Sequence, residues 1–135
     1  MNADQARIWF RHVREDMKSV RNNLYGPDPS LETAAYACQQ AAEKMVKAVL
    51  VHRDRQPPMI HSIRPLVDLL PPTDPLVPRL LPLVRFSAYA YAYRYPSFSA
   101  HEPTFEPPVR EEVEAWLADL EELERYLVQE LGLID

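Results

Sequence analysis

The 135-residue chain is long enough to bury one hydrophobic core, its hydrophobic content of 47% is ordinary for a globular protein, and its net charge is −5. Two glycines against 14 prolines argue against an all-β protein built on tight hairpins, and no apolar run is long enough to span a membrane. The first residues lack the apolar core of a signal peptide, and a single cysteine excludes an internal disulfide. We therefore expect one cytoplasmic domain over residues 1–135, without a membrane anchor.

The first predicted helix covers residues 4–24. Its apolar side chains recur at helical spacing on one face: Trp9, Val13, Met17, Val20 and Leu24. Basic residues at intervals of three and four, from Arg7 to Arg21, predict a basic strip on the exposed side. The Gly-Pro-Asp-Pro sequence that begins at Gly26 should end this helix.

The second predicted helix starts after Ser30, a good N-cap residue, and runs to about Arg53. Residues 34–50 read AAYACQQAAEKMVKAVL, with a stripe of small and apolar residues that lets a neighbouring helix approach closely. We expect Cys38 on that stripe to be a buried side chain. The polar residues between are denser than a solvated face requires: Gln39, Gln40, Glu43, Lys44 and Lys47. This face is the best candidate for shared chemistry or contact.

The second half of the chain is punctuated by prolines. A short helix is predicted over Ile63–Leu70 and a fourth helix over Leu76–Tyr95, which Pro82 should start or kink. Residues 87–95, SAYAYAYRY, also alternate with the period of a strand, but alanine favours a helix and a lone strand has no obvious partner. We expect the tyrosines here to pack more than to stack on bases.

The last predicted helix runs from about Val109 to Leu131, and Gly132 is placed to stop it. The predicted fold is therefore all-α: an up-and-down antiparallel bundle of four long helices plus one short helix.

Charge is unevenly distributed along the chain. Residues 1–101 carry 13 basic and 9 acidic side chains, whereas residues 102–135 carry 2 and 11. We interpret the acidic segment as a solvated helix face. The alternative is a non-catalytic interaction domain whose acidic last helix docks a basic partner.

Three segments resemble a known family: CQQAAEKMVKAVL at residues 38–50, PPMIHSI at 57–63 and RYP at 94–96. Their order and spacing are similar to those of the HEPN domain of higher eukaryotes and prokaryotes. The resemblance implies an up-and-down bundle of four or five helices, usually a homodimer, that associates with nucleotides or RNA. It also implies, for small prokaryotic members, a minimal nucleotidyltransferase partner in a toxin–antitoxin pair.

The wider superfamily includes metal-independent ribonucleases that use an arginine followed, after four to six residues, by a histidine. Arg94 and His101 match this pattern with six residues between them. A histidine can act as general base or acid, and an arginine can hold the phosphate. However, Pro96 predicts that the helix ends before His101, so the distance between the two is open. Alternatively, Arg94 pairs with an acidic side chain and His101 is a surface residue.

Further residues are candidates for ligand contact. Gln40, Lys44 and Lys47 could line a phosphate-binding groove with Arg94, or the lysines could pair with Glu43 or the acidic last helix. His61 either contacts a ligand or fixes the loop that carries it, and Tyr95 could stack on a base.

The leading hypothesis is a HEPN-type module that binds a nucleotide, RNA or a nucleotidyltransferase partner, and the alternative is a metal-independent endoribonuclease. The four histidines and one cysteine show no zinc-type spacing, and there is no glycine-rich phosphate loop. We expect neither a metal nor a cofactor.

Overall fold

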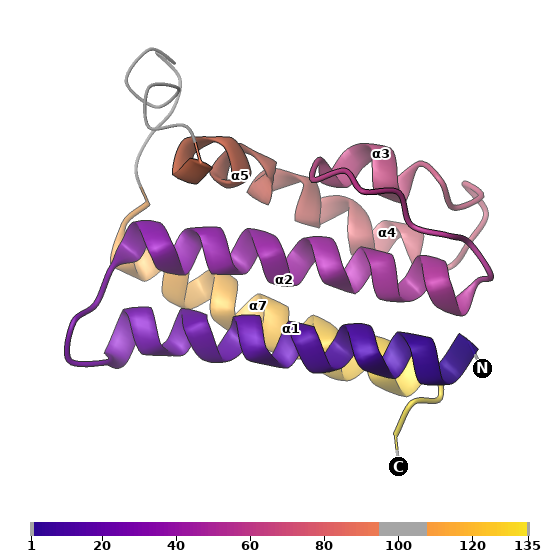
Figure 1. Ribbon diagram of the computed structural model, residues 1–135, viewed down its shortest axis with the longest axis horizontal. Coiled ribbons are helices and arrows are strands. Elements are labelled where there is room, and N and C mark those ends of the chain that lie inside the picture. The colour runs from indigo at the N-terminus through magenta and orange to yellow at the C-terminus, as the bar shows by residue number, and fades with distance from the viewer. Residues whose placement is uncertain (1, 95–107, 135) are drawn as a thin grey trace.

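The computed structural model describes the backbone of residues 2–94 and 108–134 and the side chains of residues 2–90 and 108–134. All regular structure in these ranges is helical, which confirms the predicted all-α class (Figure 1). The helices, in chain order, are α1 (Asn2–Tyr25), α2 (Leu31–His52), α3 (Ile63–Val67), α4 (Val77–Leu80), the 3₁₀ helix η1 (Leu81–Phe86), α5 (Ser87–Arg94) and α7 (Arg110–Glu130).

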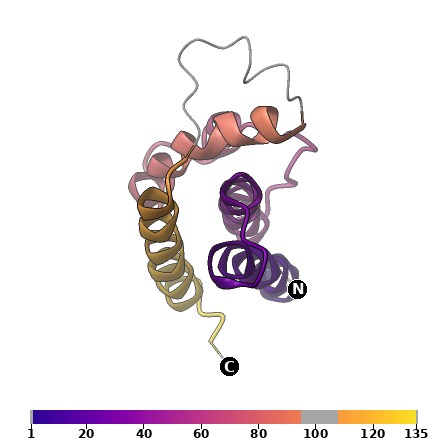
Figure 2. The ribbon, with the colours of Figure 1, turned by 90° about the vertical axis from the view of Figure 1, so that its left-hand side faces the viewer.

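Helix α2 is the centre of the molecule. It packs against α1, α7, α3, η1 and α5, and in the end-on view it lies inside the curve that these elements form (Figure 2). Its small side chains allow this close approach on several sides, and Ala34, Cys38, Ala41 and Val49 are fully buried. Because nearly the whole circumference of α2 is covered, polar residues on it are also drawn into the interior.

The connection between α1 and α2 reverses the chain, so the two helices lie antiparallel (Figure 1). A Cβ atom at Gly26 would lie 2.4 Å from the carbonyl oxygen of Asn22, which leaves room only for glycine after the last turn of α1. The Ser30 hydroxyl then accepts a hydrogen bond from the backbone N–H of Thr33 at 3.2 Å. The predicted end of the first helix and the predicted cap of the second are both confirmed.

The buried stripe of α1 differs from the prediction at one position. Phe10 is in the core in line with Val13 and Met17, whereas Trp9 is only partly buried. Phe10 stands three and seven residues before Val13 and Met17, which centres it on the buried face. Trp9, one residue before Phe10, lies at the edge of that face and remains partly accessible.

The predicted fourth long helix is wrong in its continuity. The segment is split into α4, the 3₁₀ helix η1 and α5, so the described long helices are α1, α2 and α7. Pro82 is the second residue of η1, and a proline there removes a backbone donor and clashes with the preceding turn of an α-helix. The helical choice for residues 87–94 is confirmed over the strand, because these residues form α5.

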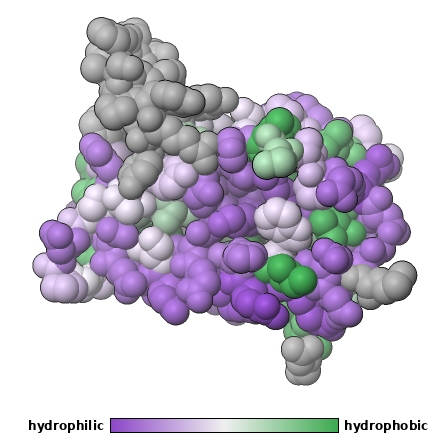
Figure 3. All heavy atoms as spheres, in the orientation of Figure 1, coloured by the Kyte–Doolittle hydropathy of each residue, from purple (hydrophilic) through white to green (hydrophobic). Residues whose placement is uncertain are grey.

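Helix α7 lies behind α1 and α2 in Figure 1 and ends at Glu130. Gly132, the residue predicted to stop it, follows with a left-handed φ of 69°. Its buried face consists of Val113, Leu117, Leu120, Leu123 and Leu127. The face of the molecule seen in Figure 3 is mainly hydrophilic, with separate hydrophobic spots and not one continuous apolar patch. None of the described helices has both the length and the hydrophobicity of a membrane-spanning segment.

Candidate functional site

Three polar side chains of α2 are buried one above another. Gln39, Glu43 and Lys47 are spaced by four residues, which places them on one face of the helix, and all three are buried. The Lys47 ammonium donates to Glu43 Oε2 at 2.9 Å, and Gln39 Nε2 donates to Glu43 Oε1 at 3.0 Å. The buried carboxylate is thus satisfied from both directions along its own helix.

His61 completes this network from the segment before α3. Its Nδ1 lies 3.2 Å from Glu43 Oε1, and its side chain is 48% exposed while that of Glu43 is 4% exposed. An imidazole whose Nδ1–H donates to a carboxylate keeps Nε2 for another partner. The buried carboxylate therefore holds a histidine whose side chain is about half exposed.

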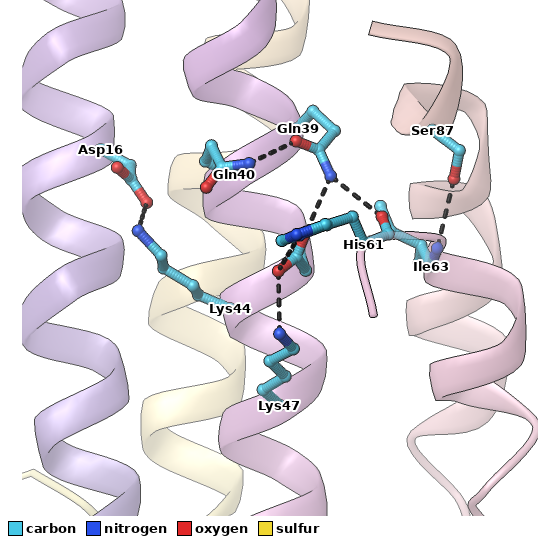
Figure 4. A network of polar contacts seen from close by, with 9 residues as sticks. Asp16, Gln39, Gln40, Lys44, Lys47, His61, Ile63 and Ser87 are labelled. Atoms are coloured by element: carbon cyan, nitrogen blue, oxygen red, sulfur yellow. Dashed lines mark hydrogen bonds and ion pairs between the residues drawn. The ribbon is translucent and has the colours of Figure 1, made fainter. Parts of the chain in front are cut away.

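The backbone on both sides of the His61 ring is fixed as well. Gln39 Nε2 also donates to the carbonyl oxygen of His61 at 3.2 Å, and the Ser87 hydroxyl accepts a hydrogen bond from the N–H of Ile63 at 3.3 Å (Figure 4). Ile63 itself is fully buried. The segment is anchored to α2 and α5 at once, so the imidazole is positioned before any ligand arrives.

Lys44 and Gln40 extend the polar contacts toward α1. The Lys44 ammonium donates to Asp16 of α1 at 2.7 Å, and Gln40 Nε2 donates to Gln39 Oε1 at 2.7 Å (Figure 4). Burial raises the pKa of the Asp16 carboxyl, and the nearby Lys44 opposes that shift.

The structure therefore brings four of the predicted ligand residues to one helix and its adjoining loop: Gln40, Lys44, Lys47 and His61. Both lysines have a carboxylate partner inside the molecule, Glu43 for Lys47 and Asp16 for Lys44. Their role toward a phosphate stays a prediction.

The proposed catalytic pair is not located by the structure. Arg94 is the last residue of α5, but its side chain lies outside the described residues, as do His101 and Tyr95. Tyr89 shows the predicted tyrosine packing among the described residues, since the centre of its ring lies 5.3 Å from the centre of the Trp116 ring. The separation of Arg94 from His101 stays open.

The predicted burial of Cys38 is confirmed. Its side chain is fully buried, and burial raises the pKa of the thiol to about 12. At neutral pH it is therefore a protonated, inert core residue. Within the described ranges, no three His, Cys, Asp or Glu side chains are grouped so that they could hold a metal ion.

The acidic face of α7 is engaged by basic side chains of the same chain. Arg21 of α1 contacts Glu121 at 3.2 Å, and Arg85 contacts Asp119 at 3.1 Å. Arg79 contacts Glu122 in the same way. The acidic segment and the basic strip predicted on α1 thus partly neutralise one another within the molecule.

Comparison with known proteins adds the family. A model of the HEPN domain matches residues 6–131. The chain belongs to the HEPN domain family. No curated protein and no solved structure matches it. The match spans α1 to α7 and includes the whole polar network on α2, so this network lies within the HEPN domain.

Two residues of the network are not predicted from the sequence as part of the site. Glu43 is expected only as a possible partner of the lysines, and Gln39 is not among the candidate ligand residues. Their common signal is the four-residue spacing from Gln39 through Glu43 to Lys47. That spacing marks one helix face, but it does not show that the segment carrying His61 packs on this face. Burial turns these three residues from a solvated strip into the support of His61.

Proposed function

We propose that this HEPN domain binds RNA or a nucleotide and that His61 contacts a phosphate of the ligand. The observation that carries the proposal is the half-exposed His61 imidazole held by the buried Glu43 carboxylate at 3.2 Å. A side chain oriented in this way loses little freedom when a ligand binds.

The charge balance of the network favours an anion. Lys47 already balances Glu43, so a proton on His61 adds positive charge that no further carboxylate of the network offsets. The protonated ring can then donate from Nε2 to a phosphate oxygen while Nδ1 donates to Glu43. Glu43 and Gln39 act through His61 as positioning residues.

The experiment is an RNA-binding titration with a His61→Ala variant. The fluorescence anisotropy of a labelled single-stranded RNA would be followed as protein is added, at fixed low salt, with His12→Ala as the matched control. His12 is an exposed histidine of α1. Loss of one hydrogen bond to a charged group should weaken binding by about tenfold or more in the His61 variant.

Two results would contradict the proposal: no saturable binding by the unaltered protein, or equal binding by the His61 and His12 variants. Circular dichroism and the thermal midpoint of each variant check that the fold is retained. A titration with a free nucleotide in competition separates a nucleotide ligand from an RNA strand.

The proposal extends to assembly, location and activity. We expect an up-and-down antiparallel bundle that forms a cytoplasmic homodimer with a minimal nucleotidyltransferase as partner in a toxin–antitoxin pair, as the family resemblance suggests. Light scattering and copurification test the dimer and the partner. For Arg94 and His101, we expect any ribonuclease activity to persist in EDTA and to be lost in His101→Ala.

A further inference from the structure

A second feature lies at the far end of the same face of α2. A surface hollow of about 390 Å³ is enclosed by the first turns of α1, the last turn of α2 and the segment that follows. In Figure 1 the start of α1 and the end of α2 lie side by side at one end of the molecule. The hollow is lined by Asn2, Gln5, Trp9, Val51, Asp54, Arg55, Gln56 and Pro57.

The walls of the hollow are tied together by the chain itself. Beyond the end of α2 the chain turns back: Arg55 N–H donates to the carbonyl oxygen of Leu50 at 2.8 Å, and Asp54 adopts a φ of 63°. The Asn2 side chain donates to the Asp54 carboxylate, which joins the start of α1 to this turn. Contacts within the chain therefore hold the walls of the hollow in place.

The lining residues combine a flat aromatic ring, amide groups and one guanidinium group. Trp9 is partly accessible, so a nucleobase can stack on its indole. The amides of Gln5 and Gln56 offer donors and acceptors to a base edge, and the Arg55 guanidinium suits a phosphate. Asp54 is an acceptor that suits ribose hydroxyls but repels a phosphate.

Lys47 lies between the hollow and the His61 network. The Lys47 ammonium that bonds Glu43 lies 5.8 Å from the centre of the Trp9 ring, and Val51 is one turn beyond Lys47 on α2. From Glu43 to Val51 the helix rises about 12 Å. One extended ligand can therefore touch both places.

We propose that the Trp9 hollow is a subsite for one nucleotide unit, with the base stacked on Trp9 and a phosphate held by Arg55. The unit comes either from a free nucleotide or from an RNA strand whose neighbouring phosphate reaches His61. This inference rests on the proposed function and names the subsite that recognises the base.

The test follows the fluorescence of Trp9 while ligand is added. The chain has two tryptophans, so Trp116→Phe leaves Trp9 as its only tryptophan. The probes are adenosine 5′-monophosphate, adenosine and a short oligoadenylate. We expect saturable quenching, and a loss of affinity of about tenfold in Arg55→Gln for the phosphorylated probes.

The matched control is Arg125→Gln, which removes an exposed arginine of α7 and should leave the affinity unchanged. Because Trp116 packs against Phe86 and Tyr89, its replacement could unfold the chain. In that case the indole N–H resonance of Trp9, assigned by Trp9→Phe in the otherwise unaltered protein, gives the same readout.

Quenching by both phosphorylated probes supports a nucleotide subsite, and quenching by the oligoadenylate alone supports the same subsite for a strand. The proposal is overturned if no probe gives a saturable change at Trp9 or if Arg55→Gln and Arg125→Gln bind equally. If RNA binding depends on His61 while Trp9 never responds, the subsite fails and the proposed function stands. If a nucleotide gives a saturable change at Trp9 but His61→Ala binds RNA like the unaltered protein, the proposed contact between His61 and a phosphate is wrong and the Trp9 subsite stands.

Discussion

The ion pair between Glu43 and Lys47 gives the sharpest prediction about stability. The perturbation is Glu43→Gln, which keeps the size of the side chain and an acceptor oxygen but removes its charge. In the unaltered protein the Lys47 ammonium lies 2.9 Å from Glu43 Oε2, and the two side chains are 9% and 4% exposed. The variant therefore leaves a buried ammonium without its carboxylate.

The expected cost follows from that burial. Breaking a buried pair by removing one partner costs about 3–5 kcal/mol, because the remaining charge is desolvated without compensation. The amide oxygen of the new glutamine can still accept from Lys47, so we expect the lower end, about 3 kcal/mol. For a domain of this size, that corresponds to a fall in the thermal midpoint of roughly 10 °C.

The assay is urea denaturation at constant neutral pH and protein concentration, comparing Glu43→Gln, Lys47→Met and the double variant. The double variant contains no unpaired charge, so it should be more stable than Glu43→Gln alone although it carries one more substitution. A free energy of unfolding for Glu43→Gln within about 1 kcal/mol of the unaltered protein, at an unchanged denaturant slope, would refute the reasoning. Additive effects in the double variant would also refute it.

Three further predictions concern other parts of the chain. The Arg53 guanidinium lies 2.9 Å from the Asp74 carboxylate and lowers the pKa of Asp74. Asp74→Asn should therefore lower the free energy of unfolding by about 1–2 kcal/mol near neutral pH, and this difference should shrink as the pH falls below about 4, where an unfolded aspartate becomes protonated. A difference that does not change with pH in urea titrations would contradict this. Cys38, with a pKa raised to about 12, should react with a thiol reagent only after denaturation, whereas rapid labelling of the native protein would show that the core opens. Gly132→Ala should lower the free energy of unfolding by about 1 kcal/mol. The cost comes from the backbone alone, because φ is 69° and no atom lies within 4 Å of the added methyl group. An unchanged thermal midpoint would mean that the helix end relaxes.

The features predicted best from the sequence are those that depend on residues adjacent in the chain. The hairpin turn at Gly26, the cap at Ser30 and the stop at Gly132 all follow from local backbone chemistry, and each is present. Pro82 is predicted to start or kink its helix, and it lies at the second position of η1, where the segment is split. However, the interruption extends over the whole 3₁₀ helix Leu81–Phe86, which the spacing of the apolar residues does not predict.

The site depended on contacts that local patterns do not contain. The sequence marks the face through Gln39, Glu43 and Lys47 as unusual, but its covering contacts come from outside α2: His61 lies against Glu43, and Trp9 of α1 lies near Lys47. Likewise, the sequence spacing places Trp9 in the apolar stripe of the first helix. In the structure Phe10 takes the core position, and Trp9 lines the hollow. Spacing determines which residues share a face, whereas the other helices decide what that face meets.

The spacing of Glu43 and Lys47 also bears on the order in which the protein folds. The two residues are one turn apart on the same helix, so their ion pair can form as soon as α2 coils, before α3 or α5 arrives. Water is then removed from an already neutral pair, and no lone charge has to enter the closing core. We expect the transition state of folding to contain α2 with this pair formed, and His61 to join it only as the loop docks.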